Sequence, residues 1–298
     1  MQRVNVVPEQ LSFSPVVQGY WRLNDWNMQA QDILRFVEQG LELGITTTDH
    51  ADVYGAFTEE GLFGQAMKLA PGLRDKIEIV SKCGILFPCE MQPDVQVVHY
   101  NNDRDYIIAA AERSLRELHT EYLDVLLIHR PDPLMDADAV AEAFSRLKQS
   151  GKVKHFGVSN FSAAKFALLQ SRLDFPLVTN QLEISAIHTE YLFDGNLDYL
   201  QQQSVKPMAW SCLGGGGVFH DFQYKALREC AEAIGEQHNA SLDQVLMAFV
   251  LALPSCPIPI IGSGNIERVR QQAAAVDIKL SRQQWFSLLE AARGYTVP

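Results

Sequence analysis

The chain has 298 residues, of which 47% are hydrophobic and 20% charged, a composition that predicts a folded globular protein and excludes intrinsic disorder. Its 36 acidic and 25 basic residues give a formal net charge of -11, which argues against binding to nucleic-acid phosphates or anionic lipid. The five cysteines are scattered and contain no C-x-x-C pair, so neither a disulfide framework nor a zinc site is expected.

No apolar run reaches the roughly 18 residues that a membrane-spanning helix needs. The first ten residues, MQRVNVVPEQ, lack the basic, apolar and small-residue order of a signal peptide. We therefore expect a cytoplasmic protein.

Short apolar or β-branched segments alternate along the chain with longer segments of helical periodicity. The expected strands, in chain order, are 15–20, 44–49, 77–82, 123–129, 154–160, 176–181, 205–210 and 257–263. The helices expected after them are 29–43, 59–70, 103–118, 136–150, 162–171, 194–203, 222–237 and 265–275. Eight such units predict an α/β protein with a (β/α)8 TIM barrel, and an open doubly wound sheet is the alternative.

Three segments lie outside this alternation. Residues 2–14 predict an N-terminal β-hairpin that closes the bottom of the barrel. Residues 83–102 form a long irregular insertion, and loops of that length are usually functional or mobile. An extra helix is expected at 241–253, with Ser241 as its N-cap. No linker composition interrupts the chain, so we expect a single domain over residues 1–298.

Polar side chains stand at the C-terminal ends of the expected strands. In a barrel of this type all these ends lie on one face, where active sites are built from several strands. The residues at these ends are Asp49, Lys82, His129, Ser159, Asn160, Gln181, Trp210 and Ser263. A single such residue is more often a cap or turn former, but the whole set predicts a site.

Aspartate, tyrosine, lysine and histidine together suit hydride transfer to a carbonyl with proton donation to its oxygen. Tyrosine is a weak acid with a reference pKa of about 10, and a nearby ammonium lowers that value. Lys82 is a candidate for this neighbour of Tyr54, Asp49 for the partner of Lys82, and His129 for a hydrogen-bond donor to the substrate.

Several motifs resemble those of the aldo-keto reductase family, nearly from end to end of the chain. They are DHADVYG at 49–55, IVSKCG at 79–84, LLIHRPD at 126–132, FGVSNF at 156–161, TNQLEIS at 179–185 and IIGSGNIERVRQQ at 260–272. The sequence is most similar to the bacterial YdhF-type oxidoreductases of that family. This resemblance implies that Tyr54 is the general acid, that Lys82 lowers its pKa, that Asp49 pairs with Lys82 and that His129 orients the carbonyl.

The resemblance also implies a bound NADP(H). Ser159, Asn160 and Gln181 match positions that contact the nicotinamide carboxamide, and Trp210 matches the aromatic residue that stacks on the ring. The expected pyrophosphate loop includes Ser211, Cys212, Leu213, Gly214 and Gly215. The expected adenosine end comprises Gly262, Ser263, Gly264, Arg268, Gln271 and Gln272. Asn265 departs from the family pattern, because many relatives carry lysine there, so a preference for NADP over NAD rests on Arg268 with help from Arg270.

Two other kinds of function stay open from the sequence. A metal-dependent barrel hydrolase would use Asp49, His50, Asp52 and His129 as ligands, although no metal is expected and we interpret His50 and Asp52 as structural. A non-catalytic redox sensor or partner subunit would hold NADP(H) without turnover. The expected partner is a small-molecule carbonyl substrate, with a pocket lined in part by Trp21, Trp26, Phe87 and Tyr100. The identity of the substrate and the choice between monomer and weak dimer stay open.

Overall fold

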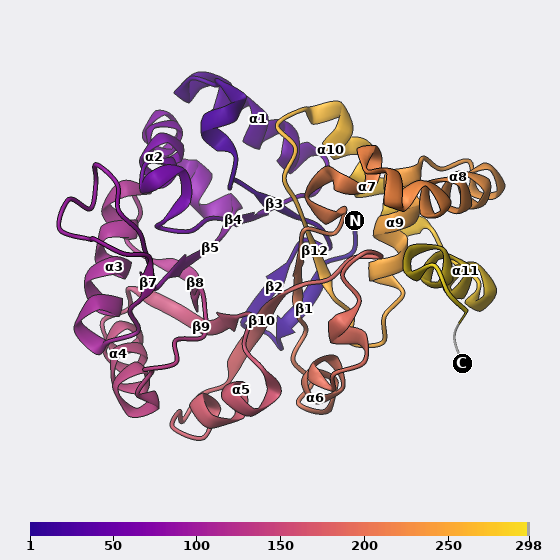
Figure 1. Cartoon of the computed structure of the whole chain (residues 1–298). Coiled ribbons are helices and arrows are strands. Elements are labelled where there is room, and N and C mark those ends of the chain that lie inside the picture. The colour runs from indigo at the N-terminus through magenta and orange to yellow at the C-terminus, as the bar shows by residue number, and fades with distance from the viewer. Residues whose placement is uncertain (297–298) are drawn as a thin grey trace. The chain divides into compact units, whose positions relative to one another are not determined.

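Eight strands close into a parallel barrel in a computed structural model that describes residues 1–296 (Figure 1). The order of the strands around the barrel is β10-β11-β12-β3-β4-β5-β8-β9. Their bounds are β3 Val17–Gly19, β4 Thr47–Asp49, β5 Glu78–Cys83, β8 Leu123–Ile128, β9 Val153–Ser159, β10 Leu177–Glu183, β11 Met208–Trp210 and β12 Ile258–Ile261. Every one of the eight expected strands is present, so the prediction of a (β/α)8 barrel is confirmed.

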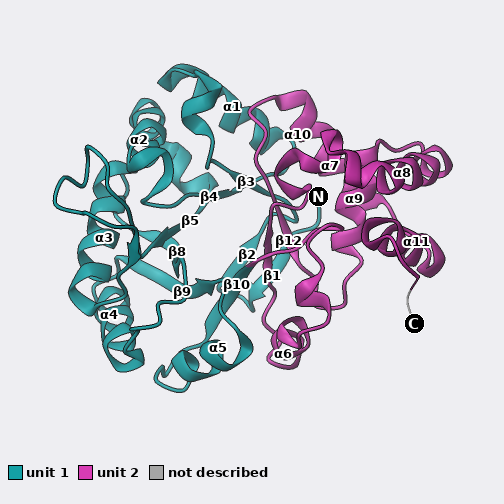
Figure 2. Ribbon diagram, in the orientation of Figure 1, with its two compact units in different colours: residues 1–181 teal, residues 182–298 magenta. Residues whose placement is uncertain are grey.

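The chain divides into two compact units, residues 1–181 and residues 182–298 (Figure 2). The expectation of one domain over the whole chain therefore stays a prediction.

In the first unit, helices form an outer row beside the strands β3, β4, β5, β8 and β9 (Figure 1). These helices are α1 Ala30–Glu42, α2 Glu59–Leu69, α3 Arg104–Glu117, α4 Ala137–Gln149 and α5 Ala163–Gln170. Each helix turns an apolar stripe inward, as α1 does with Ile33, Phe36 and Val37. Gly64 lets α2 approach the end of α3, because a Cβ at this position would lie 1.8 Å from the carbonyl oxygen of Glu117.

The second unit contains the strands β11 and β12 and the remaining helices. These are α6 Asn196–Gln202, α7 Gly217–His220, α8 Lys225–His238, α9 Leu242–Leu251, α10 Ile266–Ala273 and α11 Arg282–Arg293. Its core includes Phe249 of α9, which stacks on Trp285 of α11 with ring centroids 4.5 Å apart. Ser241 forms a capping box with Gln244 at the start of α9, in agreement with the expected N-cap.

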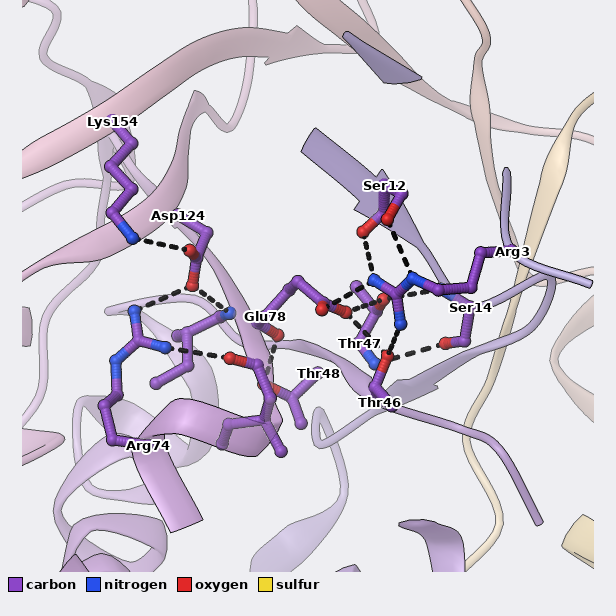
Figure 3. Close-up of polar contacts among 12 residues, drawn as sticks. Arg3, Ser12, Ser14, Thr46, Thr47, Thr48, Arg74, Glu78, Asp124 and Lys154 are labelled. Atoms are coloured by element: carbon purple, nitrogen blue, oxygen red, sulfur yellow. Dashed lines mark hydrogen bonds and ion pairs between the residues drawn. The ribbon is translucent and has the colours of Figure 1, made fainter. Parts of the chain in front are cut away.

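The N-terminal hairpin is present as β1 Val4–Val7 and β2 Leu11–Phe13, which pair antiparallel. Arg3 ties it to the amino ends of two barrel strands (Figure 3). Its guanidinium donates to Ser12 of the hairpin, to Thr46 before β4 and to Glu78 at the start of β5. The hairpin therefore lies at the end of these strands opposite to the predicted site.

The insertion after β5 is more regular than the sequence suggested. It contains a two-stranded hairpin, β6 Ile85–Leu86 paired with β7 His99–Tyr100, and an isolated bridge between Cys89 and Gln92. Leu86, Ile85 and Phe87 pack in one apolar cluster with Val53 and Phe57, on either side of Tyr54. The insertion is thus attached to the segment that carries the expected acid.

Candidate active site

Three of the four residues expected to carry the chemistry lie at the carboxyl ends of neighbouring strands in the first unit, and Tyr54 lies in the turn that follows β4. β4 pairs in parallel with β5, and β5 with β8, so Asp49 lies opposite Val80 and Lys82 opposite Leu127. His129 follows the last residue of β8, and its backbone N–H donates to the carbonyl oxygen of Cys83. Because parallel strands end at one edge, Asp49, Lys82 and His129 are presented together.

Lys82 is completely buried, and its ammonium group donates three hydrogen bonds. The acceptors are Asp49 Oδ2 at 2.8 Å, the carbonyl oxygen of His50 at 2.7 Å and the hydroxyl of Tyr54 at 2.9 Å. Burial lowers the pKa of Lys82, but Asp49 and Tyr54 outweigh that effect and leave the pKa above its ordinary value. The ammonium is therefore charged at neutral pH.

Tyr54 is half-buried in a 3₁₀ turn, Tyr54–Ala56, between β4 and α2. Burial raises the pKa of its phenol, while the charge of Lys82 opposes this increase and the carboxylates of Asp49 and Glu59 add to it. The expected lowering by Lys82 is thus present, but burial outweighs it. Tyr54 keeps its proton at neutral pH, which is the state that a proton donor requires.

His129 lies beside Tyr54, with ring centroids 5.8 Å apart and ring planes at 78°. Burial lowers the pKa of the imidazole well below its usual value, and the positive charges of Lys82 and Arg130 lower it further. The ring is therefore neutral at physiological pH. Within residues 1–296, its Nδ1 atom has no hydrogen-bond partner.

Gln181, expected to contact nicotinamide, also contacts the catalytic candidates. Its side-chain amide donates to Asp49 Oδ1 at 2.7 Å, while Asp49 Oδ2 accepts from Lys82. Both carboxylate oxygens of Asp49 are thus fixed, one of them by a residue 132 positions away in the chain. The sequence motifs indicate Gln181 only as a contact of the cofactor, and no local pattern reveals its contact with Asp49.

Ser159 and Asn160 join the same polar edge. The hydroxyl of Ser159 donates to the carbonyl oxygen of Gln181 at 2.9 Å and accepts from the amide of Asn160 at 2.8 Å. The Asn160 amide also reaches the carbonyl oxygen of His129 at 3.3 Å. The side chains at the ends of β8, β9 and β10 are therefore linked, and their expected contacts with nicotinamide stay predictions.

In the second unit, the residues expected at the pyrophosphate follow β11. Trp210 is the half-buried last residue of that strand. Ser211 and three successive glycines, Gly214, Gly215 and Gly216, have positive φ angles between 52° and 100°. A Cβ at Gly215 or Gly216 would meet no atom within 4 Å, so there is space beside the chain at these two residues. Cys212 is buried, and its thiol donates to the carbonyl oxygen of Ala209.

The expected adenosine end lies at the start of α10. Asn265 is the N-cap of this helix, and its side-chain oxygen accepts from the backbone N–H groups of Glu267 at 3.0 Å and Arg268 at 3.2 Å. Ser263 accepts from the N–H of Asn265. Arg268 and Gln271 are exposed, whereas Gln272 is buried. The departure from lysine at position 265 therefore has a structural role, as a helix cap.

The side chains of His50 and Asp52 pack against residues other than the catalytic candidates. The His50 ring stacks on Tyr20 and meets Phe63 edge-on, and Asp52 forms an ion pair with Arg113 at 2.8 Å. Among residues 1–296, no three metal-ligating side chains are grouped, so the ligand set proposed for a hydrolase is not assembled.

Of the residues expected to line the substrate pocket, Trp21 is exposed, with its ring centroid 6.5 Å from that of Tyr54. Trp26 instead packs against Tyr20 and Phe36, at centroid distances of 5.6 and 5.3 Å. Phe87 packs on Phe57, and Tyr100 is exposed on β7. Their contacts with a substrate stay predictions.

The sequence motifs implied membership of the aldo-keto reductase family, and the comparison with known families gives the same result. Residues 15–293 match the model of the aldo/keto reductase family, and the chain belongs to this family. It is 57% identical to oxidoreductase YdhF of Escherichia coli and 42% identical to a 6-dehydroglucose reductase of Agrobacterium fabrum, each over the full length of both chains. The resemblance to YdhF-type enzymes is thus confirmed.

A solved structure gives the same result for the fold. An aldo/keto reductase from Klebsiella pneumoniae, crystallised with NADP and acetate, has a TM-score of 0.78 and 28% sequence identity, and the match covers 99% of this chain and 96% of that one.

None of the helices within residues 1–296 combines the length and apolar character needed to cross a bilayer.

Proposed function

We propose that this oxidoreductase uses NADPH to reduce an aldehyde or ketone to an alcohol, with Tyr54 as the general acid. The observation that carries the proposal is the buried ammonium of Lys82, which lies 2.9 Å from the phenol oxygen of Tyr54 and 2.8 Å from Asp49. The nucleotide supplies the hydride. The protein must then supply a proton and stabilise the charge that this proton leaves behind.

Each of the four side chains has a part in that step. As Tyr54 gives its proton to the carbonyl oxygen, negative charge develops on the phenol oxygen beside the ammonium of Lys82. Asp49, fixed by Gln181, holds this ammonium charged and in place. Neutral His129 is suited to donate a hydrogen bond to the carbonyl oxygen, because it carries one N–H and no charge.

The residues present fit NADP(H). A Cβ at Gly215 or Gly216 would meet no atom within 4 Å, so a phosphate has room to approach the chain there, and Ser263 with the exposed Arg268 suits a 2′-phosphate. We propose that Ser159, Asn160 and Gln181 bind the carboxamide, that Trp210 stacks on nicotinamide, and that Gln271 and Gln272 reach adenine. The complex of the Klebsiella relative with NADP supports this choice of cofactor.

A titration followed by a carbonyl panel tests the proposal. NADPH and NADH are titrated by fluorescence, and turnover is then measured at fixed NADPH with aldehydes, ketones, quinones and sugar carbonyls. A 6-dehydroglucose substrate belongs in the panel, because one relative is named for its reduction. Binding of NADPH without turnover of any carbonyl would favour the alternative, a non-catalytic redox sensor or partner subunit.

Replacing Tyr54 by phenylalanine tests the role of the acid. Tyr54→Phe keeps the ring and its packing but removes the proton, so turnover should fall by roughly 10² or more while the dissociation constant for NADPH is nearly unchanged. Both are measured on the same preparation, by NADPH absorbance and by fluorescence. Turnover equal to that of the unmodified protein would remove Tyr54 from the mechanism.

A further inference from the structure

The acid of the proposed reaction stands on a segment that has little regular structure. β4 ends at Asp49 and α2 begins at Glu59, with only one 3₁₀ turn between them. Three successive residues after Tyr54 have left-handed backbone angles, and two of them, Ala56 and Phe57, are not glycine. Such angles are unfavourable for residues with a Cβ, so contacts from outside the segment must hold this conformation.

Arg113 of α3 supplies contacts on both sides of Tyr54. Its Nη2 atom lies 2.8 Å from Asp52 Oδ2, two residues before Tyr54. Its guanidinium carbon lies 5.0 Å from the ring centroid of Phe57, three residues after Tyr54, where a cation over an aromatic face is attracted to it. α2, which follows the segment that carries Tyr54, packs side by side with α3 (Figure 1). Arg113 therefore reaches this segment from a neighbouring helix.

Asp52 is also attached to the strand that carries the lysine. Its backbone N–H donates to the carbonyl oxygen of Lys82 at 2.9 Å. This hydrogen bond attaches Asp52 to Lys82, whose ammonium reaches the phenol of Tyr54, and the ion pair with Arg113 attaches Asp52 to α3. A shift of Asp52 would change the position of the Tyr54 hydroxyl relative to this ammonium.

A buried ion pair of this kind is weak evidence for a role in stability. The side chain of Asp52 has no exposed surface, and within residues 1–296 its Oδ1 atom has no hydrogen-bond partner. Burial raises the pKa of Asp52, Arg113 opposes this increase, and the nearby carboxyl of Glu60 adds to it. Apolar side chains of similar size would often stabilise such a position equally well, so a buried pair of this kind is better explained by the geometry that it imposes.

We propose that Arg113 and Asp52 are positioning residues for Tyr54. By holding both flanks of the 52–57 segment against α3, they keep the phenol at the distance from Lys82 that proton transfer requires. This inference rests on the proposed function of Tyr54.

The test compares Arg113→Met with Arg113→Lys, with Arg116→Met as the matched control on the exposed face of the same helix. We expect Arg113→Met to lower kcat by about 10- to 100-fold, because small displacements of a reacting group have effects of that size. KM and the dissociation constant for NADPH should change by less than about two-fold. Arg113→Lys keeps the charge and should recover part of the loss, and Arg116→Met should leave kcat unchanged.

A role in stability alone gives a different result: Arg113→Met would melt at a lower temperature yet keep its kcat at temperatures where it is folded, and that outcome overturns the inference. If Arg113→Met does not fold, Asp52→Ala, which removes the carboxylate that accepts from Arg113, is judged by the same criterion. Tyr54→Phe separates the two proposals. An inactive Tyr54→Phe with an unchanged Arg113→Met contradicts only the positioning role, whereas an active Tyr54→Phe contradicts the proposed function as well.

Discussion

The side chain of Asn265 accepts hydrogen bonds from backbone N–H groups at the start of α10, where a phosphate could otherwise bind. The first backbone N–H groups of a helix have no partner within the helix, and two of them here, those of Glu267 and Arg268, donate to the side chain of Asn265. In the proposed complex with NADPH, recognition of the 2′-phosphate would depend on the guanidinium of Arg268, because Asn265 carries no charge. Arg270 is partly engaged, since it lies 3.6 Å from Glu267.

Arg268→Ala should therefore weaken NADPH binding by roughly 1.5 to 3 kcal/mol, the contribution of a charge-assisted hydrogen bond. NADH lacks the 2′-phosphate, so its dissociation constant should change little. Both constants are measured by fluorescence titration, with Arg282→Ala at the exposed start of α11 as a control for the loss of one positive charge. Equal losses for the two nucleotides would contradict the role of Arg268.

Among the elements, the loop between β3 and α1 is connected to the start of α2 by Glu59. The Glu59 carboxylate accepts from the backbone N–H of Asn24 at 3.1 Å, and the side chain of Asn24 donates to Thr58. This loop also carries Trp21, which lies near Tyr54. Burial raises the pKa of Glu59 from 4.5 to about 7, although the N–H groups of Asn24 and Leu23 oppose the increase and Asp25 adds to it.

The stability of the fold should depend on pH through this carboxyl. Because its pKa is higher in the folded than in the unfolded state, folding is favoured below pH 4.5, and that stabilisation is lost as the pH rises through about 7. Glu59→Gln cannot titrate. The melting temperature of the variant relative to the unmodified protein should therefore increase between pH 5 and pH 8, measured by differential scanning fluorimetry. A constant difference across this range would show that Glu59 does not titrate there.

The elements themselves were largely predictable, because each strand and most helices have a local pattern. The helix α11 was missed although its signals were present: Ser281 and Gln284 form a capping box at its start, and Gly294 has a left-handed conformation after its end. The insertion at 83–102 was expected to be irregular, since its β6–β7 pairing joins two-residue strands that are too short to show a period.

The sequence indicated which residues make up the candidate site, but not the contacts that hold these residues in place. Motif positions identified Asp49, Tyr54, Lys82 and His129, and the structure brings them to one edge of the sheet. The contacts that hold them, Gln181 with Asp49 and Arg113 with Asp52, join residues 132 and 61 positions apart. Such pairs depend on how strands and helices are packed, and no local periodicity contains that information.

At the scale of the whole molecule, the two ends of the strands in residues 1–181 have different polar networks. The carboxyl ends carry the catalytic candidates, and the amino ends carry ion pairs that join one strand to the next (Figure 3). Arg74 donates to Asp124 at 2.7 Å and to the carbonyl oxygen of Tyr122, and Asp124 accepts from the N–H of Ile79. Lys154 lies 3.5 Å from the same carboxylate. In barrels of this type, the amino-terminal face serves stability.

Arg74→Ala should therefore lower the free energy of unfolding without changing kcat. Removing Arg74 leaves the largely buried Asp124, within residues 1–296, with only the more distant Lys154 as a charged partner, at a cost on the order of 3 kcal/mol. Urea denaturation measures this loss. Arg172→Ala, which breaks the exposed pair with Asp138, is the matched control and should cost less than about 1 kcal/mol. A similar loss for both variants would contradict a special role for the network around Asp124.

All three N–H groups of the Lys82 ammonium donate hydrogen bonds, and this has a chemical consequence. An amine condenses with an aldehyde only through its free lone pair, and an enzyme that handles aldehydes exposes every uncharged lysine to that side reaction. The three protons of Lys82 are each taken by a separate acceptor, and its side chain has no exposed surface. In the proposed carbonyl reduction, the same contacts that hold this ammonium beside Tyr54 would therefore also prevent Lys82 from forming an imine with an aldehyde substrate.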